Sequence, residues 1–187
     1  MSIPINLWIF YVAGYAIAYP LRIWADRKRG EPFEDPELLS QKKVLIPAMI
    51  WLIGGFLISL FVPVNFGFLF YFGLFFAIIG LIIVVMTFYS FACESGLTTT
   101  RLHRYSRNPN YIGWTFFMGG LSLIGWSESI WSLLFLLYFF YTVGYLHWTV
   151  LLEEAFLANK YGESYQEYLK TTPRYFGRSK KSKNNDK

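Results

Sequence analysis

Residues 66–92 read FGFLFYFGLFFAIIGLIIVVMTFYSFA, a stretch with no charged side chain. A helix that crosses a bilayer needs about 20 mostly apolar residues, because each residue advances the helix by about 1.5 Å. Four other apolar runs cover residues 5–21, 44–62, 111–124 and 130–152. The fourth run along the chain, 111–124, is short enough to be tilted or to begin with an interfacial turn. The sequence therefore predicts an all-α, polytopic membrane helix bundle with about five transmembrane helices.

The composition supports this class. Of the 187 residues, 55% are hydrophobic, 21% are aromatic and only 16% are charged, whereas about 25% of residues are charged in an ordinary globular domain. A chain of this length is expected to form one domain, here residues 1–187. The single cysteine, Cys93, leaves no thiol cluster for a metal ion, so we predict no metal site.

The basic residues predict the orientation in the membrane. All 17 fall into three segments that alternate with two loops lacking Lys and Arg. They are Arg22, Arg27, Lys28, Arg29, Lys42 and Lys43 in the first segment, Arg101, Arg104 and Arg107 in the second, and eight residues between Lys160 and Lys187 in the third. Because basic segments stay inside, we expect the N-terminus outside and the C-terminus in the cytoplasm. No basic residue precedes Arg22, which favours an uncleaved first helix over a signal peptide.

No charged side chain lies in the middle of a predicted span, which argues against pumps, ion transporters and voltage sensors. The chemistry is therefore expected at the cytoplasmic interface, with membrane lipids as neighbours and without nucleic acid or an obligatory protein partner. The basic tail at about 178–187 is expected to be disordered, or to be attracted to anionic headgroups.

The first polar block whose residues could bind a ligand or take part in a reaction is GLTTTRLHRYSRNPNYIG, residues 96–113. Asn108 precedes a proline and predicts a turn, and Pro109 is suited to the first position of a helix. The free N–H groups of that helix start form a ready anion site, to which Arg107 adds a guanidinium fork. Arg101 and Arg104 are equally consistent with contacts to lipid phosphates alone.

The second polar block is EEAFLANKYGESYQEYLKTTPRYFG, residues 153–177. Glu153 and Glu154 lie about 100° apart on a helix, so one can face the bundle while the other faces water. The apolar spacing predicts that the fifth span continues as a helix past the membrane. A turn at Gly162 and a short cytoplasmic C-terminal helix should follow.

A helical hairpin separates the two blocks, so both are expected at the same face of the membrane. Cationic groups and helix N–H donors from one block and carboxylates from the other suit a zwitterionic ligand such as an amino acid. Gly113, Gly119 and Gly120 are expected to allow close approach of neighbouring backbones.

At these residues the sequence resembles the integral-membrane methyltransferases related to isoprenylcysteine carboxyl methyltransferase and phospholipid N-methyltransferase. RYSRNPNYIG, residues 104–113, is similar to the second half of a family motif that runs Gly-Pro-Tyr-Arg-Tyr-x-Arg-His/Asn-Pro-x-Tyr-x-Gly. The Glu pair, the Tyr-x-x-Tyr spacing and the Pro-Arg of residues 153–176 resemble the later motif. The resemblance covers about residues 80–177, which would form the cofactor-binding half.

The resemblance implies S-adenosylmethionine as cofactor, bound at the cytoplasmic ends of the last helices. The implied cofactor-binding residues are Arg107, Asn108, Pro109, Tyr111, Gly113, Glu153 and Glu154, with His103 in the adjoining loop. Arg107 would meet the cofactor's carboxylate, and Glu154 or Glu153 its ammonium group. Asn108 stands where many members have histidine, so a titrating role at this position is excluded.

The expected reaction is methyl transfer to a lipophilic substrate that enters from the inner leaflet, with Glu154, Tyr111 and Arg107 as the catalytic candidates. A prenylcysteine carboxylate, a phospholipid amine and a thiol all remain open as acceptors. The alternatives are a membrane enzyme that resembles NADPH-dependent sterol reductases, and a small scaffold without enzymatic activity.

Overall fold

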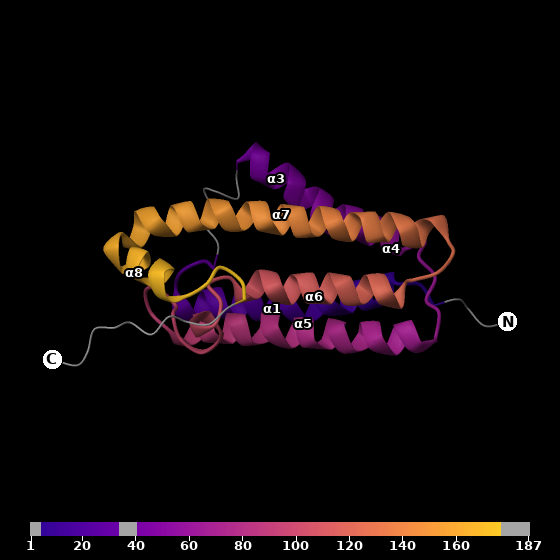
Figure 1. The fold of residues 1–187 in the computed structure, drawn as a ribbon, viewed down its shortest axis with the longest axis horizontal. Coiled ribbons are helices and arrows are strands. Elements are labelled where there is room, and N and C mark those ends of the chain that lie inside the picture. The colour runs from indigo at the N-terminus through magenta and orange to yellow at the C-terminus, as the bar shows by residue number, and fades with distance from the viewer. Residues whose placement is uncertain (1–4, 34–40, 177–187) are drawn as a thin grey trace.

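The computed structural model describes residues 5–33 and 41–176, and every regular element within these ranges is helical (Figure 1). The one β-type pairing in the described chain is an isolated bridge between Asn6 and Pro63. The all-α prediction is therefore confirmed. The predicted disordered tail, residues 178–187, lies outside the described residues.

The helices form rods that run back and forth along one bundle axis (Figure 1). In chain order they are α1 (Trp8–Arg29), α3 (Lys42–Met49), the π-helical η1 (Ile50–Gly54), α4 (Gly55–Ser59), α5 (Phe68–Cys93), the 3₁₀-helical η2 (Arg101–Arg104), α6 (Pro109–Ile124), α7 (Ile130–Tyr161) and α8 (Glu163–Thr171). The predicted continuation of the fifth run is confirmed, because α7 extends to Tyr161 before the turn at Gly162 and α8.

Three helical stretches of the described chain are long and apolar enough to cross a membrane. These are Lys42–Ser59, Phe68–Cys93 and Ile130–Tyr161. Helix α6 has only 16 residues, which at 1.5 Å per residue is about 24 Å, less than the hydrocarbon core of about 30 Å. Helix α1 is long enough, but its last two turns carry the charges of residues 22–29. The number of crossings therefore stays a prediction.

Helices α5 and α6 share the most extensive interface of the bundle, and glycines on both helices make it possible. A Cβ atom on Gly80 would lie 2.5 Å from the carbonyl oxygen of Gly113, and one on Gly120 would lie 2.5 Å from that of Gly73. The expected close approach at Gly113 and Gly120 is confirmed. The expectation for Gly119 was wrong, because its nearest neighbour is the ring of Phe139 at ordinary contact distance.

The rod formed by α3, η1 and α4 is attached differently. Its α3 end diverges from the rest of the bundle (Figure 1). Tyrosine hydroxyls from the neighbouring helices donate to its main-chain oxygens: Tyr11 to Leu52 at 2.9 Å, Tyr141 to Pro47 at 2.9 Å, and Tyr138 to Trp51. Side-chain hydrogen bonds thus hold a helix that the π-helical turn makes irregular.

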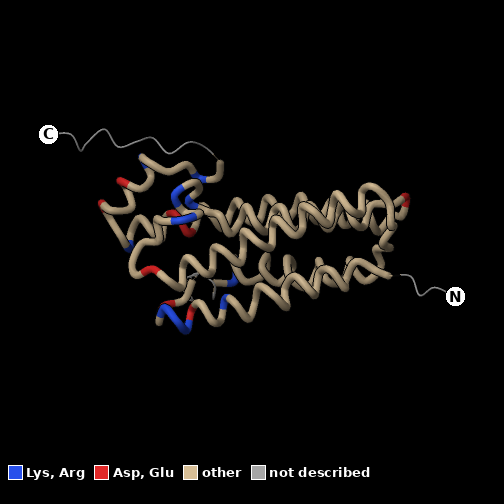
Figure 2. Tube along the Cα trace, turned by 90° about the horizontal axis from the view of Figure 1, so that it is seen from below, with Lys and Arg blue, Asp and Glu red and all other residues tan. Residues whose placement is uncertain are grey.

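Charged residues gather at one end of the bundle (Figure 2). This charged end is formed by residues 22–33, 41–43, 94–108 and 153–176, which the alternation of the helices brings together. At the opposite end, Glu128 carries the only charge within the described ranges. The fold thus gathers both polar blocks of the sequence at one end.

Candidate functional site

The start of α6 is built as the sequence predicts. Pro109 occupies the first turn of the helix, and the N–H of Asn108 donates to the Ser106 hydroxyl at 3.1 Å. That hydroxyl in turn donates to the carbonyl oxygen of Arg174 at 3.0 Å. The helix start is therefore fixed to the segment that follows α8.

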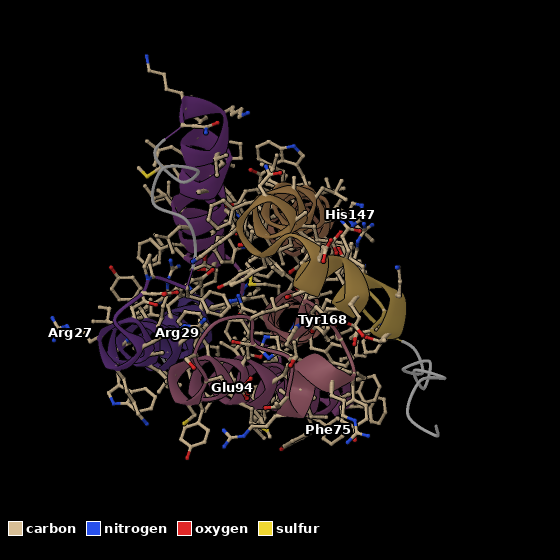
Figure 3. All side chains as sticks on the ribbon, turned by 90° about the vertical axis from the view of Figure 1, so that its left-hand side faces the viewer. Arg27, Arg29, Phe75, Glu94, His147 and Tyr168 are labelled. Atoms are coloured by element: carbon tan, nitrogen blue, oxygen red, sulfur yellow. The ribbon has the colours of Figure 1, made fainter. Side chains whose placement is uncertain are left out.

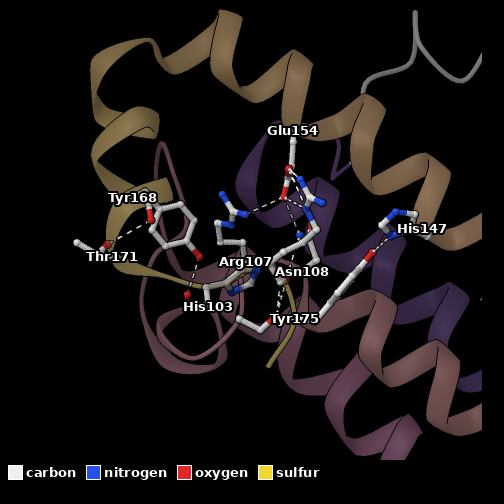
Figure 4. Close-up of polar contacts among 10 residues, drawn as sticks. His103, Arg107, Asn108, His147, Glu154, Tyr168, Thr171 and Tyr175 are labelled. Atoms are coloured by element: carbon white, nitrogen blue, oxygen red, sulfur yellow. Dashed lines mark hydrogen bonds and ion pairs between the residues drawn. The ribbon is translucent and has the colours of Figure 1, made fainter. Parts of the chain in front are cut away.

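Glu154 is the centre of a polar cluster at the charged end (Figure 4). Arg174 donates to both of its carboxylate oxygens through Nε, at 3.0 and 3.1 Å, and through Nη2 at 2.7 Å. Arg107 Nη2 lies 3.3 Å from the same carboxylate, and the Asn108 side-chain amide donates to it at 3.4 Å. The hydrogen bonds that Arg174 donates to Glu154 raise the pKa of Arg174. The carboxylate is thus fully engaged within the protein.

The segment after α8 crosses the start of α6. The N–H of Arg107 donates to the carbonyl oxygen of Pro173 at 3.0 Å, and the Asn108 side chain donates to that of Arg174 at 3.2 Å. The predicted meeting of the two polar blocks is confirmed. Arg174 was absent from the predicted site, although the Pro-Arg pair of the later motif was the signal that could have found it.

A cavity of about 290 Å³, lined by charged, aromatic and aliphatic side chains, lies beside this cluster and is close to the lower end of the range typical of small-ligand sites. Of the predicted site residues, His103, Arg107, Asn108, Pro109, Tyr111 and Glu153 line it. Glu154 does not line it, because the next position along α7 faces a different direction and its side chain meets Arg174 instead. Gly113 does not line it either, since it packs against Gly80.

Four side-chain atoms around this cavity are buried and have no hydrogen-bond partner in the described structure: Arg29 Nε, His103 Nδ1, Arg107 Nε and Asn110 Oδ1. Buried polar groups in folded proteins are nearly always paired, so such a concentration indicates a place for a polar ligand. Burial lowers the pKa of His103 to about 4, so this imidazole is neutral at pH 7.

Arg29 also lines this cavity, although its place in the sequence predicted only a role in membrane orientation. It ends α1 and points into the bundle, whereas Arg27 points away from it (Figure 3). Its guanidinium lies 3.9 Å from the centre of the Phe91 ring and donates to the Thr98 hydroxyl at 2.9 Å. The sequence offered little indication of this role for Arg29, because the three adjacent cations at the end of α1 differ only in the direction that each side chain faces.

A second cavity, of about 450 Å³, lies between α1, the α3–η1 segment, α6 and α7. Its lining is mainly apolar and aromatic, with Arg22 and Glu153 as the charged members. Asn110, Tyr111 and Glu153 line both cavities. These three residues therefore form the boundary where a ligand in one cavity would meet a ligand in the other.

Comparison with known proteins gives one match. The family model described as phospholipid methyltransferase matches residues 67–164, more than half of the chain. No curated protein and no solved structure matches significantly. The matched residues include α5, α6 and α7 and every residue shared by the two cavities. On this evidence the chain is an integral membrane protein that belongs to the phospholipid methyltransferase family.

Proposed function

We propose that this protein transfers a methyl group from S-adenosylmethionine to an amine on a lipophilic acceptor. The cofactor would occupy the 290 Å³ cavity and the acceptor the 450 Å³ cavity. The observation that supports this best is the shared boundary of Asn110, Tyr111 and Glu153, because a transfer reaction needs two ligands to meet.

The residues of the first cavity fit the cofactor. Its carboxylate would be held by the buried guanidinium groups of Arg107 and Arg29, whose Nε atoms donate no hydrogen bond in the described structure, and by the start of α6. Its ammonium group would meet Glu153, which leaves Glu154 to position Arg107 and Arg174. When bound, the cofactor supplies a methyl group on a positively charged sulfur.

The boundary residues favour an amine over the other acceptors. Asn110 Oδ1 is an unpartnered hydrogen-bond acceptor, and Glu153 is a carboxylate, so this boundary suits a ligand atom that carries N–H groups. A substrate carboxylate or thiolate would bring a second negative charge beside Glu153. The Glu153 carboxylate, through the oxygen that does not face the cofactor's ammonium group, would take the proton that the acceptor amine must lose before it reacts, and the Tyr111 hydroxyl would accept a hydrogen bond from that amine.

We also propose that all five rods cross the membrane, with the charged end in the cytoplasm and the N-terminus outside. The alternation of basic and non-basic ends supports this orientation. The acceptor would then enter the second cavity sideways from the inner leaflet.

Calorimetry on the purified protein in nanodiscs tests the cofactor assignment. We expect S-adenosylmethionine to bind, and Glu153→Gln to weaken its affinity by about tenfold or more, since a charged hydrogen bond contributes about 1.5–3 kcal/mol. Glu128→Gln, at the opposite end of the bundle, is the matched control and should bind as the parent does.

Heat with NADPH and none with S-adenosylmethionine would instead favour the reductase alternative. An absence of heat with both would favour the scaffold. Equal affinity of the parent and the Glu153→Gln variant would remove Glu153 from the cofactor site.

A further inference from the structure

The second cavity has its own unpartnered donor. Trp51 lines this cavity, and its Nε1 atom is buried with no hydrogen-bond partner among the described residues. The rings of Tyr15, Trp114 and Tyr145 surround the indole, with centroid distances of 5.8, 5.5 and 5.7 Å. A buried N–H without a hydrogen-bond partner is costly unless a ligand accepts its hydrogen bond.

The fold holds this indole in place. Trp51 lies in the π-helical turn η1, a type of irregularity that often occurs at functional sites. The hydroxyls of Tyr11 and Tyr138 donate to the carbonyl oxygen of Trp51 from two different helices. The main chain of η1 is thereby tied to α1 and α7, and the side chain is confined by its aromatic neighbours.

The cavity around Trp51 reaches the outer surface of the bundle, where a lipid can enter. Its lining includes Tyr19, Leu45 and Leu52, whose exposed fractions are 63%, 46% and 45%. A lipid acyl chain is therefore the natural apolar part of an occupant.

The depth of Trp51 decides which part of such a lipid it meets. Tyr145, its neighbour on α7, precedes Glu153 by eight residues, which corresponds to about 12 Å along the helix. Arg22, the one cation among the described lining residues, follows Tyr15 by seven residues and so lies about 10 Å closer to the charged end. A phosphate is expected at the level of Arg22, and a neutral oxygen at the level of Trp51.

We propose that Trp51 Nε1 donates a hydrogen bond to an acyl ester carbonyl oxygen of the acceptor lipid, about 12 Å from the amine that is methylated. Indole N–H is a donor only, so its partner must be an acceptor such as this oxygen. This inference rests on the proposed function for the identity of the reacting end. Trp51 would then be a specificity residue that selects ester-linked lipids and sets how far the amine reaches toward Glu153.

The test compares two lipids that differ only in the carbonyl: a diacyl phosphatidylethanolamine and its dialkyl ether analogue of equal chain length. The protein, with ¹⁵N-labelled indoles, is titrated with each lipid in lipid-free detergent micelles. The Trp51 indole resonance is identified as the one missing from Trp51→Phe. Affinities come from the shifts of the remaining indole signals.

We expect the parent to bind the diacyl lipid about five- to tenfold more tightly than the ether lipid, as one hydrogen bond predicts. Only the diacyl lipid should move the Trp51 indole proton downfield. Trp51→Phe should bind both lipids equally. Trp131→Phe, at the far end of α7, is the matched control and should keep the parental preference.

Equal binding of the two lipids by the parent, or an unchanged preference in Trp51→Phe, would overturn the proposal. If Trp51→Phe does not fold, the affinities of the parent for the two lipids, which need no assignment of the Trp51 resonance, decide alone. A clear ester preference without methyl transfer to either lipid would contradict the proposed function and leave this subsite standing. Methyl transfer without an ester preference would overturn the Trp51 subsite and leave the proposed function standing.

Discussion

The α5–α6 pair and the α3–η1–α4 rod border the same bundle but are attached to it by opposite means. In α5–α6 the backbones touch at Gly73, Gly80, Gly113 and Gly120. In the rod, three tyrosine hydroxyls from α1 and α7 donate to main-chain oxygens and add to the packing of its few buried side chains. Close-packed backbones tolerate little movement, whereas side-chain hydrogen bonds can be exchanged individually.

This difference in attachment corresponds to a difference in what the two cavities would have to do. Helix α6, held rigidly against α5, presents Asn110 and Tyr111 at the 290 Å³ cavity, and Arg107 lies just before its start, where a charged cofactor would need fixed donors. The α3–η1–α4 rod forms a wall of the apolar cavity, where a lipid would have to enter and leave. Three predictions test this comparison, in order of the effect expected.

The largest effect is expected at the backbone contacts of α5–α6. Gly80→Ala places a Cβ atom 2.5 Å from the Gly113 carbonyl oxygen, so the helices must separate. We expect the free energy of unfolding to fall by at least about 3 kcal/mol, at the upper end of overpacking effects. Denaturant titration in mixed micelles measures it.

Gly144→Ala on α7 is the matched control, because nothing lies within 4 Å of the added atom. It should leave stability unchanged or raise it slightly, since alanine favours helix. Similar losses for the two variants would contradict the rigid α5–α6 interface.

A second effect concerns the connection between α5 and α6. His103 has a pKa of about 4 when folded, below its ordinary 6.5, because it is buried. The unfolded chain therefore binds the proton more readily, and stability present above pH 6.5 should be lost as the pH falls toward 4. The expected loss is up to about 3 kcal/mol.

Thermal unfolding at several pH values compares the parent with His103→Gln, which cannot titrate. The variant should have a much flatter stability profile between pH 6.5 and 4. Parallel profiles would show that His103 is accessible to protons in the folded state.

The smallest effect is expected in the tyrosine attachments of the α3–η1–α4 rod. Tyr138→Phe removes one hydroxyl from the Trp51 carbonyl oxygen and should cost about 1 kcal/mol, the net value of one hydrogen bond. Hydrogen exchange should quicken for residues 47–55 and stay unchanged for α5 and α6.

Tyr71→Phe, which alters an exposed hydroxyl at the start of α5, serves as the control. A loss of several kcal/mol in Tyr138→Phe, or faster exchange throughout the bundle, would mean that the rod is as firmly integrated as α5–α6.

Local features of this protein could be read from the chain. Pro109 begins α6 and Gly162 separates α7 from α8, because the fixed φ of proline and the positive φ open to glycine act within a few residues. The π-helical turn at Ile50–Gly54 was not predicted, because hydrophobicity does not distinguish it from an α-helix. The partner of Glu154 was not predicted either, since Arg174 follows twenty residues later on a crossing segment.

The sequence by itself determined the all-helical class, the charged end and the pairing of the two polar blocks. These follow from the length of the apolar runs and from the alternation of charge, which are properties of short segments. Only the tertiary structure decided that Glu153 lines the cavities while Glu154 binds Arg174, and that Arg29 turns inward while Arg27 does not. Adjacent residues on a helix differ by about 100° in direction, and only the packing of the other helices decides whether a given direction faces a cavity, a neighbouring side chain or the outside of the bundle.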